Sequence, residues 1–440
     1  MKKRLLAVLL AGMMALSVTA CGGGGSDDEN KDGGSDSGKL VIPFIGYTDD
    51  QIKAAEQTAK ENGTELGAEA KYHMQLMDAV KEKYPDYDVD WQDWGWAEAL
   101  DQKQRATLTA GSPLDLVAGE TFMPTYANEG ILEPLPQDIV DLVTPSYLIN
   151  DAEGKPVAVS LKSSVFMLFY NKDLMEKAGL DPNTPPKTWD EFKEMSDKIT
   201  EAGKGEFWGG GIPSFPHAGG ALRATPFFRQ LGTDFGVDGK INLSDSKVQE
   251  TLQFIRDMNK NFPEGLGNNA SEDPMWNAFQ KDQTVAFAIN GAWQQTGCDQ
   301  NNMNWGVAPL PTKDGTEGNC LVGSNFVGVP KASKHKEEAF NIIRVALQED
   351  LQKLWLTEST SSGLKSILDN PDLYSDNPTL TTANEAIKGG TFSGVAVFPK
   401  NDAQVWEVLN QKVLARTTMT NDPIDEICSQ ATQEIEALLK

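Results

Sequence analysis

The 440-residue sequence has only three histidines and lacks the common catalytic motifs. His73, His217 and His335 stand far apart, and no His-Glu-x-x-His pattern of a zinc protease occurs. The Gly-x-Ser-x-Gly turn of serine hydrolases and the glycine-rich phosphate loop that ends in Lys-Ser or Lys-Thr are also missing. We therefore expect neither a metal nor a cofactor. One enzyme class stays open, a glycan hydrolase with two carboxylates, because 64 acidic residues offer many pairs.

Basic residues and long apolar runs are also scarce. The formal net charge is −25, from 39 basic and 64 acidic residues. A body this acidic repels phosphate backbones, which argues against a nucleic-acid partner. After the first 20 residues, no segment has the continuous apolar length of a membrane-spanning helix.

The sequence has four cysteines, at positions 21, 298, 320 and 428. Cys21 belongs to the N-terminal segment described next, and an odd number remains for disulfides. Cys298 and Cys320 are close enough in sequence to form a bridge. The alternative is that all three remaining cysteines are small, unpaired, buried side chains.

The N-terminus has the features of an export signal. Lys2, Lys3 and Arg4 precede an apolar run, Leu5–Ala20, that is too short for a permanent membrane helix. The run ends in Val-Thr-Ala-Cys, which resembles the lipobox of bacterial lipoproteins and implies cleavage before a lipidated Cys21. An ordinary secretory signal with a chance cysteine is the alternative. The polar, Gly- and Ser-rich residues 22–38 cannot bury enough apolar surface to fold, so we expect a disordered tether.

Beyond the tether, strand and helix patterns alternate. Strands are predicted at Leu40–Ile45, Asp88–Trp94 and Leu114–Ala118, separated by helical segments, and this alternation indicates a parallel sheet covered by helices. Pro156–Asn171 is a long β-rich run that could pass from one domain into another. Later segments predict a capped helix after Thr188, a helix over 246–261, strands at Thr284–Asn290 and Trp305–Leu310, one helix after Ser333 and a last helix from Asp422.

Tryptophan is the informative excess, with ten residues. An indole offers a flat apolar face and one N–H donor, which matches the apolar face and hydroxyl rim of a pyranose. Trp189, Trp355 and Trp305 fit helix or strand patterns and are predicted to be structural. The tryptophans that could lie at loops or element ends, and so contact a ligand, are Trp94, Trp208, Trp276, Trp293 and Trp406.

Four stretches in a fixed order carry a family resemblance. They are Leu114–Glu120 followed by Tyr126–Leu135, Leu168–Leu174 followed by Pro186–Phe192, Val285–Trp293 followed by Trp305–Pro311, and Gly323–Pro330. Together they resemble the extracellular solute-binding proteins of family 1, the group that contains maltose-binding protein. Residues 208–220, rich in Gly and Pro, and the three tryptophans of residues 88–96 depart from the maltose-binding pattern, so the resemblance does not carry maltose over.

The resemblance implies an α/β fold class: two doubly wound α/β lobes joined by a hinge, as in type II periplasmic binding proteins. The N-terminal lobe would comprise residues 39–160 plus about 327–365, and the C-terminal lobe 161–326 plus about 366–440, after a signal peptide (1–20) and a lipidated tether (21–38). The chain would cross between lobes near 157–165, 322–328 and 360–368.

The resemblance also implies a ligand site in the cleft. Glu120, Thr121 and Phe122 follow a predicted strand end, where open α/β sheets bind ligands. Lys162 and Ser163 lie in the first crossing, and Ser324 and Asn325 lie in the second. Trp293 and Trp406 match aromatic platforms. Tyr170 and Asn171 are interpreted as structural.

The implied function is capture of a carbohydrate, an oligosaccharide, for an ABC importer. The implied partners are the solute and the transmembrane permease subunits, with a lipid anchor at Cys21 on the extracellular face of the bacterial cytoplasmic membrane. We expect a monomer without enzymatic activity. Three alternatives stay open: a same-fold receptor for a polyamine, peptide or anion, a glycan-degrading enzyme, and an adhesin or sensory protein without transport.

Overall fold

The structure analysed is a computed structural model of the chain. It describes residues 39–43, 48–63, 65–95, 97–120, 122–316, 322–357, 360–389, 395–398 and 400–440. The predicted signal peptide, the tether, Cys21, Thr121 and Cys320 lie outside these residues, and for Ser163 and Ser324 only the backbone is described. Residues 39–440 form one compact unit.

One four-stranded sheet has the order β3 (Val117–Gly119), β12 (Val322–Gly328), β5 (Pro156–Val165), β4 (Leu148–Asn150). Beside it, β1 (Lys39–Pro43) and β2 (Asp88–Gln92) pair in parallel. We call these strands and the helices around them the first lobe. The helices are α1 (Asp49–Asn62), α2 (Ala68–Lys83), α3 (Ala97–Thr109), α4 (Met123–Asn128), α5 (Gln137–Leu142), α12 (Lys336–Ala346), α13 (Glu349–Leu356) and α14 (Lys365–Leu368).

A second four-stranded sheet has the order β11 (Trp305–Ala308), β6 (Met167–Asn171), β10 (Val285–Asn290), β7 (Trp208–Gly210). We call it and its helices the second lobe. They are α6 (Lys172–Lys177), α7 (Trp189–Gly203), α8 (Ala218–Gln230), α9 (Ser246–Asn259), α10 (Asp273–Trp276), α11 (Gln294–Gln300), α16 (Asp402–Val408), α17 (Arg416–Met419) and α18 (Ile424–Leu439), with the π-helical turns η2 (Asn277–Lys281) and η4 (Leu409–Ala415).

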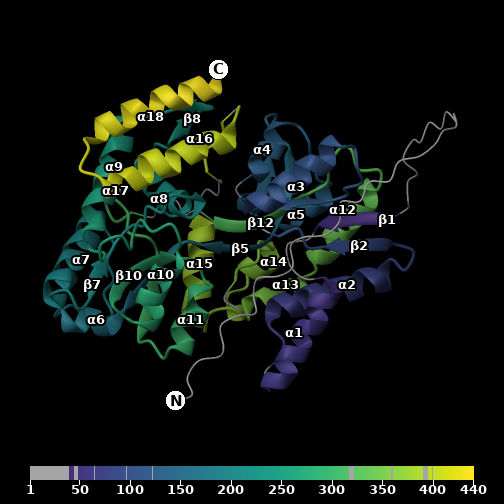
Figure 1. Ribbon diagram of the computed structural model, residues 1–440. Helices are drawn as coiled ribbons and strands as arrows, with labels where there is room; N and C mark the ends of the chain where they lie inside the picture. Colours follow the sequence, from purple (N-terminus) through teal and green to yellow (C-terminus); the bar gives the residue numbers. More distant parts are fainter. Residues whose placement is uncertain are drawn as a thin grey trace, which may run out of the picture. The chain divides into compact units, whose positions relative to one another are not determined.

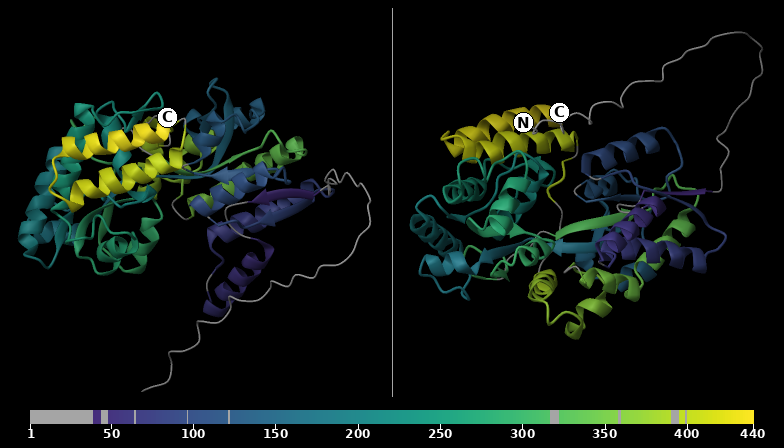
Figure 2. Two further views of the ribbon diagram at one scale, coloured as in Figure 1. Left: turned by 45° about the horizontal axis from the view of Figure 1, so that its top comes forward. Right: turned by 60° about the horizontal axis from the view of Figure 1, so that its bottom comes forward.

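The paired strands β5 and β12 of the first lobe run towards the helices of the second lobe (Figure 1). Further views show the C-terminal helices α16 and α18 packed together over the second lobe (Figure 2). The helix α15 (Pro378–Gly389) contacts both β5 and β11, so it touches strands of both sheets. The hydrophobic core is continuous through Val165 and Met167, which flank the junction between β5 and β6.

Local sequence signals explain the well-predicted helices. In α7, the Thr188 hydroxyl accepts from the Glu191 N–H and the Glu191 carboxylate accepts from the Thr188 N–H, which forms the predicted capping box. In α9, every third or fourth side chain is buried, and α18 buries the same kind of stripe. Trp189 and Trp355 are buried in the core, as predicted.

Two predictions about elements were wrong in part. The predicted helix after Ser333 is two helices, because the chain turns at Leu347 and Gln348. The Gln352 amide and the Tyr72 hydroxyl both donate to the carbonyl of Ala346, so this helix end is satisfied without continuing the helix. The predicted parallel sheet is also wrong in part. The pairs β1–β2 and β7–β10 are parallel, whereas the sheet β3-β12-β5-β4 is antiparallel throughout and β6 pairs antiparallel with β10 and β11.

Candidate functional site

A crevice of about 630 Å³ lies between the two lobes. The first lobe contributes Asp101 of α3 and Phe122, which follows β3 by three residues. The second lobe contributes the start of α8, around His217, and one face of α16 and η4. The volume falls within the roughly 300–1,000 Å³ typical of small-molecule sites. The crevice therefore has the size and position of a ligand site at strand carboxyl ends.

Trp406 is the largest aromatic side chain on the wall of this crevice. Its indole N–H donates to the carbonyl of Ala396 at 2.9 Å. Its ring meets Phe235 and Phe398 at steep angles, with centroids 6.0 and 6.3 Å away. A ring fixed by a hydrogen bond and two aromatic neighbours loses little entropy when a flat ligand face packs against it.

Two carboxylates of the wall have different surroundings. Asp101 pairs with Arg105 at 3.0 Å and accepts from the Tyr126 hydroxyl at 2.9 Å. Asp402, at the start of α16, accepts from the backbone N–H of Phe398 at 2.8 Å and from the Thr125 hydroxyl at 3.4 Å. Since Thr125 belongs to α4, this contact joins the two lobes directly across the crevice.

Burial raises the pKa of Asp402 above its ordinary value, and the Phe398 N–H only partly opposes this effect. The folded state therefore holds the Asp402 proton more tightly than the unfolded state does. The resulting stability is present below the unfolded-state pKa and is lost as the pH rises through the folded-state pKa.

Asp402→Asn is therefore expected to raise the melting temperature at pH 7, because the neutral amide removes the cost of a buried charge. A gain of about 2 °C corresponds to roughly 1 kcal/mol for domains of a few hundred residues. Thermal denaturation by circular dichroism, compared with the exposed Glu436→Gln control, measures the effect. A lower melting temperature for Asp402→Asn at pH 7 contradicts this account of Asp402.

A buried arginine lies behind the second-lobe wall. Arg223 of α8 is 3 % exposed and forms a two-pronged ion pair with Glu272, at 3.1 and 2.8 Å. Its remaining N–H groups donate to the carbonyls of Ile289 and Gly219 and to the side-chain oxygen of Asn290. All five guanidinium donors are thereby used.

Aromatic rings enclose this arginine. The guanidinium carbon lies 5.0 Å from the centroid of Phe166, 5.7 Å from Phe215 and 4.9 Å from Trp276. The Trp276 N–H also donates to Glu272 at 3.2 Å. Burial lowers the pKa of Arg223, and the Glu272 carboxylate opposes this shift. Arg223 therefore holds the rings of Phe166, Phe215 and Trp276 together.

His217 connects this cluster to the crevice. Its Nδ1 accepts from the Gly219 N–H at 3.1 Å and so caps α8, while its ring stacks on Phe215 at 5.5 Å. Burial lowers the pKa of His217, Glu272 at 4.0 Å raises it and Arg223 lowers it further. The cap needs an unprotonated Nδ1, which fits a neutral imidazole at pH 7.

Trp293 is the most exposed of the predicted ligand tryptophans that the structure describes, at 49 %. Its ring meets Phe166 edge to face at 5.8 Å. The ring lies against Gly291, where an added Cβ would come within 2.1 Å of it. Glycine at this strand end therefore lets the indole fold back beside Phe166 while leaving half of its surface open.

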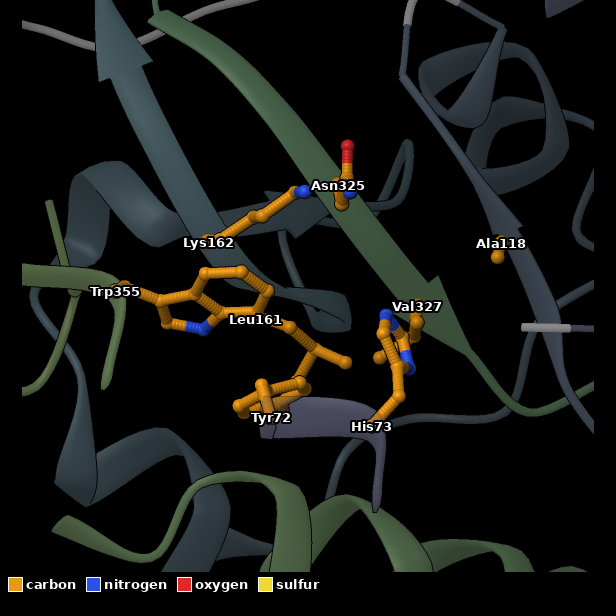
Figure 3. Close-up of a pocket in the computed structure, with 8 residues that line it drawn as sticks. All are labelled: Tyr72, His73, Ala118, Leu161, Lys162, Asn325, Val327 and Trp355. Carbon is orange, nitrogen blue, oxygen red and sulfur yellow. The ribbon is translucent and has the colours of Figure 1, made fainter. Parts of the chain in front are cut away.

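Lys162 and Asn325 face each other across β5 and β12 and line a second, much smaller cavity of about 10 Å³. Figure 3 shows Lys162 above the Trp355 indole, with His73 on the other side of the cavity. Lys162 Nζ lies 4.7 Å from the Trp355 ring centroid and pairs with Glu69. Burial, with a smaller contribution from Lys162, lowers the pKa of His73 to about 3. The space holds about one water molecule.

The other predicted site residues lie apart from the crevice or outside the described side chains. Trp94 is in the core, with its N–H on Gln92 at 2.5 Å and Lys103 over its ring. Trp208 begins β7, opposite Val285 of β10, and lines neither cavity. Glu120 is half-buried at the end of β3 and acts electrostatically on Arg223. Ser163 and Ser324 oppose each other in the backbone ladder.

Several residues of the site region were not found from the sequence, among them Asp101, Arg223, Glu272, Asp402 and Asn410. An arginine within the apolar, small-residue run Ala218–Phe228 was a usable signal, since a buried arginine needs a partner. Nothing local marks Glu272 as that partner. Asp402 and Asn410 become part of the site only through the packing of α16 against the first lobe.

Within the described part of the chain, no three His, Cys, Asp or Glu side chains are arranged to hold a metal, and no helix is long and apolar enough to cross a membrane. Cys298 and Cys428 are buried free thiols, and burial raises the pKa of each to about 12.

Comparisons with known proteins show which family the chain resembles. A model of the bacterial extracellular solute-binding proteins matches residues 45–353. A binding protein of Brucella abortus is 27% identical over 302 residues, 63% of this chain and 69% of its own length. A maltodextrin-binding protein of Bacillus subtilis is 23% identical over 366 residues, 77% of each chain.

Solved structures share the fold. A maltose-bound protein of T. maritima superimposes with a TM-score of 0.71 at 21% identity, covering 91% of this chain and 100% of that one. The two doubly wound α/β lobes predicted from the sequence are therefore confirmed. With more than half of its length matched by the family model, this chain belongs to the bacterial extracellular solute-binding protein family.

Proposed function

We propose that this protein captures a carbohydrate, an oligosaccharide, in the crevice between its lobes and delivers it unaltered to the permease of an ABC importer. The observation that carries this proposal is the crevice itself, whose wall combines the Trp406 and Phe122 rings with carboxylate and amide oxygens. Aromatic faces with hydrogen-bonding groups at their rims suit a sugar. The maltodextrin-binding relative supports the choice of ligand class.

We propose that the two bodies that move on closure are residues 39–160 plus about 327–365 and residues 161–326 plus about 366–440, so that the hinge passes through the paired strands β5 and β12. A ligand closes such a hinge only by making more contacts in the closed state than in the open state. Contacts from Asp101 and Phe122 on one lobe and Trp406 on the other would supply this difference. Affinity near micromolar corresponds to about −8 kcal/mol.

The proposed setting is the extracellular face of the cytoplasmic membrane. Cleavage before Cys21 would leave a lipidated cysteine at the N-terminus, with the tether 22–38 as the linker between the lipid and the folded lobes. Two acyl chains hold a soluble domain durably, since each buried methylene contributes about 0.8 kcal/mol. Metabolic labelling with a clickable palmitate analogue should mark the wild-type protein and leave Cys21→Ala unlabelled.

Our proposed ligand residues fall in three groups. Those that follow strand ends are Glu120, Thr121, Phe122 and Trp293, those on helices are Trp276 and Trp406, and those of the crossings are Lys162, Ser163, Ser324 and Asn325. Among these, Trp293 allows the cleanest test because half of its surface is exposed. Removing its ring should cost little fold stability.

Trp293→Ala is expected to weaken ligand binding at least tenfold while leaving the melting temperature of the ligand-free protein within a few degrees. The physical reason is the loss of apolar contact area at about 25 cal/mol per Å². Titration calorimetry measures the affinity, and Met419→Ala, which truncates another exposed apolar side chain of the second lobe, is the control. Unchanged affinity would remove Trp293 from the site.

The ligand can be found by thermal-shift screening of mono- and oligosaccharides. A ligand at a hundred times its dissociation constant adds about 2.7 kcal/mol of stability. Incubation of the hit with the protein, followed by chromatography of the sugar, separates a receptor from a glycan-degrading enzyme. Recovery of the intact sugar supports the proposal, and steady product formation contradicts it.

A further inference from the structure

The charged side chains on the crevice wall all have the same sign. Among the described residues that line it, Asp101, Asp402 and Glu407 carry charge, and neither lysine nor arginine is present. The crevice wall therefore contributes negative charge and no lysine or arginine side chain.

The basic groups nearest to the wall are already engaged. Arg105 binds Asp101 at 3.0 Å and Glu129 at 2.9 Å, and its guanidinium lies over the Tyr126 ring. Arg223 uses every N–H donor within its buried cluster. Neither arginine has the free two-pronged edge that recognises a carboxylate or a phosphate.

Asn410 adds an unmet acceptor. Its side chain is only 6 % exposed, it lines the crevice, and its Oδ1 is buried without a hydrogen-bond partner among the described residues. A buried, unpaired amide oxygen costs free energy unless a donor reaches it. Asn410 lies in the π-helical turn η4, a rare geometry that is frequent at functional sites.

Asp402 has the second unmet need. It accepts one backbone N–H and a long bond from Thr125, and none of the ion pairs among the described residues includes it. Arg105 acts on this carboxylate electrostatically but forms no ion pair with it, so a ligand that brings a cation into direct contact would gain a strong interaction. It lies two turns before Asn410 on the continuous segment of α16 and η4, and both line the crevice.

We propose that the crevice selects saccharides that carry a protonated amino group and rejects saccharides that carry a carboxylate or a phosphate, with Asp402 and Asn410 as the specificity-determining residues. This inference rests on the proposed function, since it assigns a substrate class to the same crevice. An ammonium group donates up to three hydrogen bonds and places its charge beside the carboxylate. An anionic group would face three carboxylates on a wall that lysine and arginine side chains do not line.

The test uses disaccharides of gluco, galacto and manno configuration, each in a neutral form, a 2-amino-2-deoxy form and a uronic-acid form. Titration calorimetry at pH 7 should show the amino form of at least one configuration binding at least tenfold more tightly than the neutral form. The uronic-acid form should bind at least tenfold more weakly than the neutral form. Equal affinities, or a uronic acid that matches the neutral sugar, would overturn the inference.

Variants tie the preference to the residues. In Asp402→Asn, the ratio of amino to neutral affinity should fall below about threefold, whereas Glu436→Gln, an exposed carboxylate of the same lobe, should keep the wild-type ratio. Asn410→Leu should also lower this ratio, because the ammonium group loses its second proposed acceptor. A wild-type ratio in Asp402→Asn would overturn the role of Asp402. If the neutral, amino and uronic-acid forms bind equally well, only this inference is contradicted. If no disaccharide binds, the result also counts against the proposed function.

Discussion

Replacing Arg223 with methionine is expected to lower the free energy of unfolding by about 3–5 kcal/mol, the range for breaking a buried ion pair. Glu272 would be left as a partly buried carboxylate without its partner, and the carbonyls of Ile289 and Gly219 would each lose a donor. Urea denaturation followed by tryptophan fluorescence measures the loss, because Trp276 lies 4.9 Å from the guanidinium.

The double variant Arg223→Met with Glu272→Met separates charge burial from packing. Removing both charges avoids the uncompensated carboxylate, so the double variant should be at least about 1 kcal/mol more stable than Arg223→Met alone, within the usual range of coupling between contacting residues. A single variant as stable as the wild type would show that Arg223 does not organise the rings behind the crevice. A double variant no better than the single would assign the loss to the backbone acceptors instead.

Removing both Trp293 and Trp406 is expected to weaken carbohydrate binding at least a hundredfold. Each indole should contribute about a factor of ten in affinity. No contact between the two side chains is found in the described structure, so the two losses of binding free energy should add. Titration calorimetry of both single variants and the double variant tests this expectation with the sugar identified by thermal shift.

Trp406 also packs against Phe235 and Phe398, so its loss will destabilise the second lobe. Melting curves without ligand must therefore accompany the binding data. Trp208→Phe, an indole outside the crevice, serves as the control and should bind the sugar like the wild type. A double variant that stays folded and retains wild-type affinity would contradict the aromatic basis of the site.

Features set by local sequence were predicted well. The α7 start follows from Thr188 and Glu191, and the α9 and α18 stripes follow from helical periodicity, because each depends only on neighbours within a few residues. Family motifs supplied the two-lobed fold. The break between α12 and α13 was missed. The Ala346 carbonyl accepts hydrogen bonds from Gln352 and from Tyr72, and Tyr72 is too distant in sequence for local patterns to reveal this contact.

The site was predicted only in part, for a related reason. Phe122 and Trp406 line the crevice, and Trp276 and Trp293 belong to or adjoin the Arg223 cluster. Trp94 was predicted as a possible ligand contact but lies in the core. The sequence around it does not reveal that residues of α3 and α4 belong to the same hydrophobic cluster. Asp402 could not be found from the sequence, since its contact with Thr125 spans 277 positions. Asn410 could not be found either, because only the folded structure buries its Oδ1 without a partner among the described residues.

The most direct measurement is calorimetric titration of the mature protein with the saccharide that stabilises it most, followed by recovery of that saccharide. We expect one molecule bound per chain, release of the sugar unchanged, and loss of binding when the crevice residues Trp406 and Asn410 are replaced. Sustained breakdown of the sugar, or full affinity after these replacements, would contradict a receptor that holds an intact carbohydrate between its lobes.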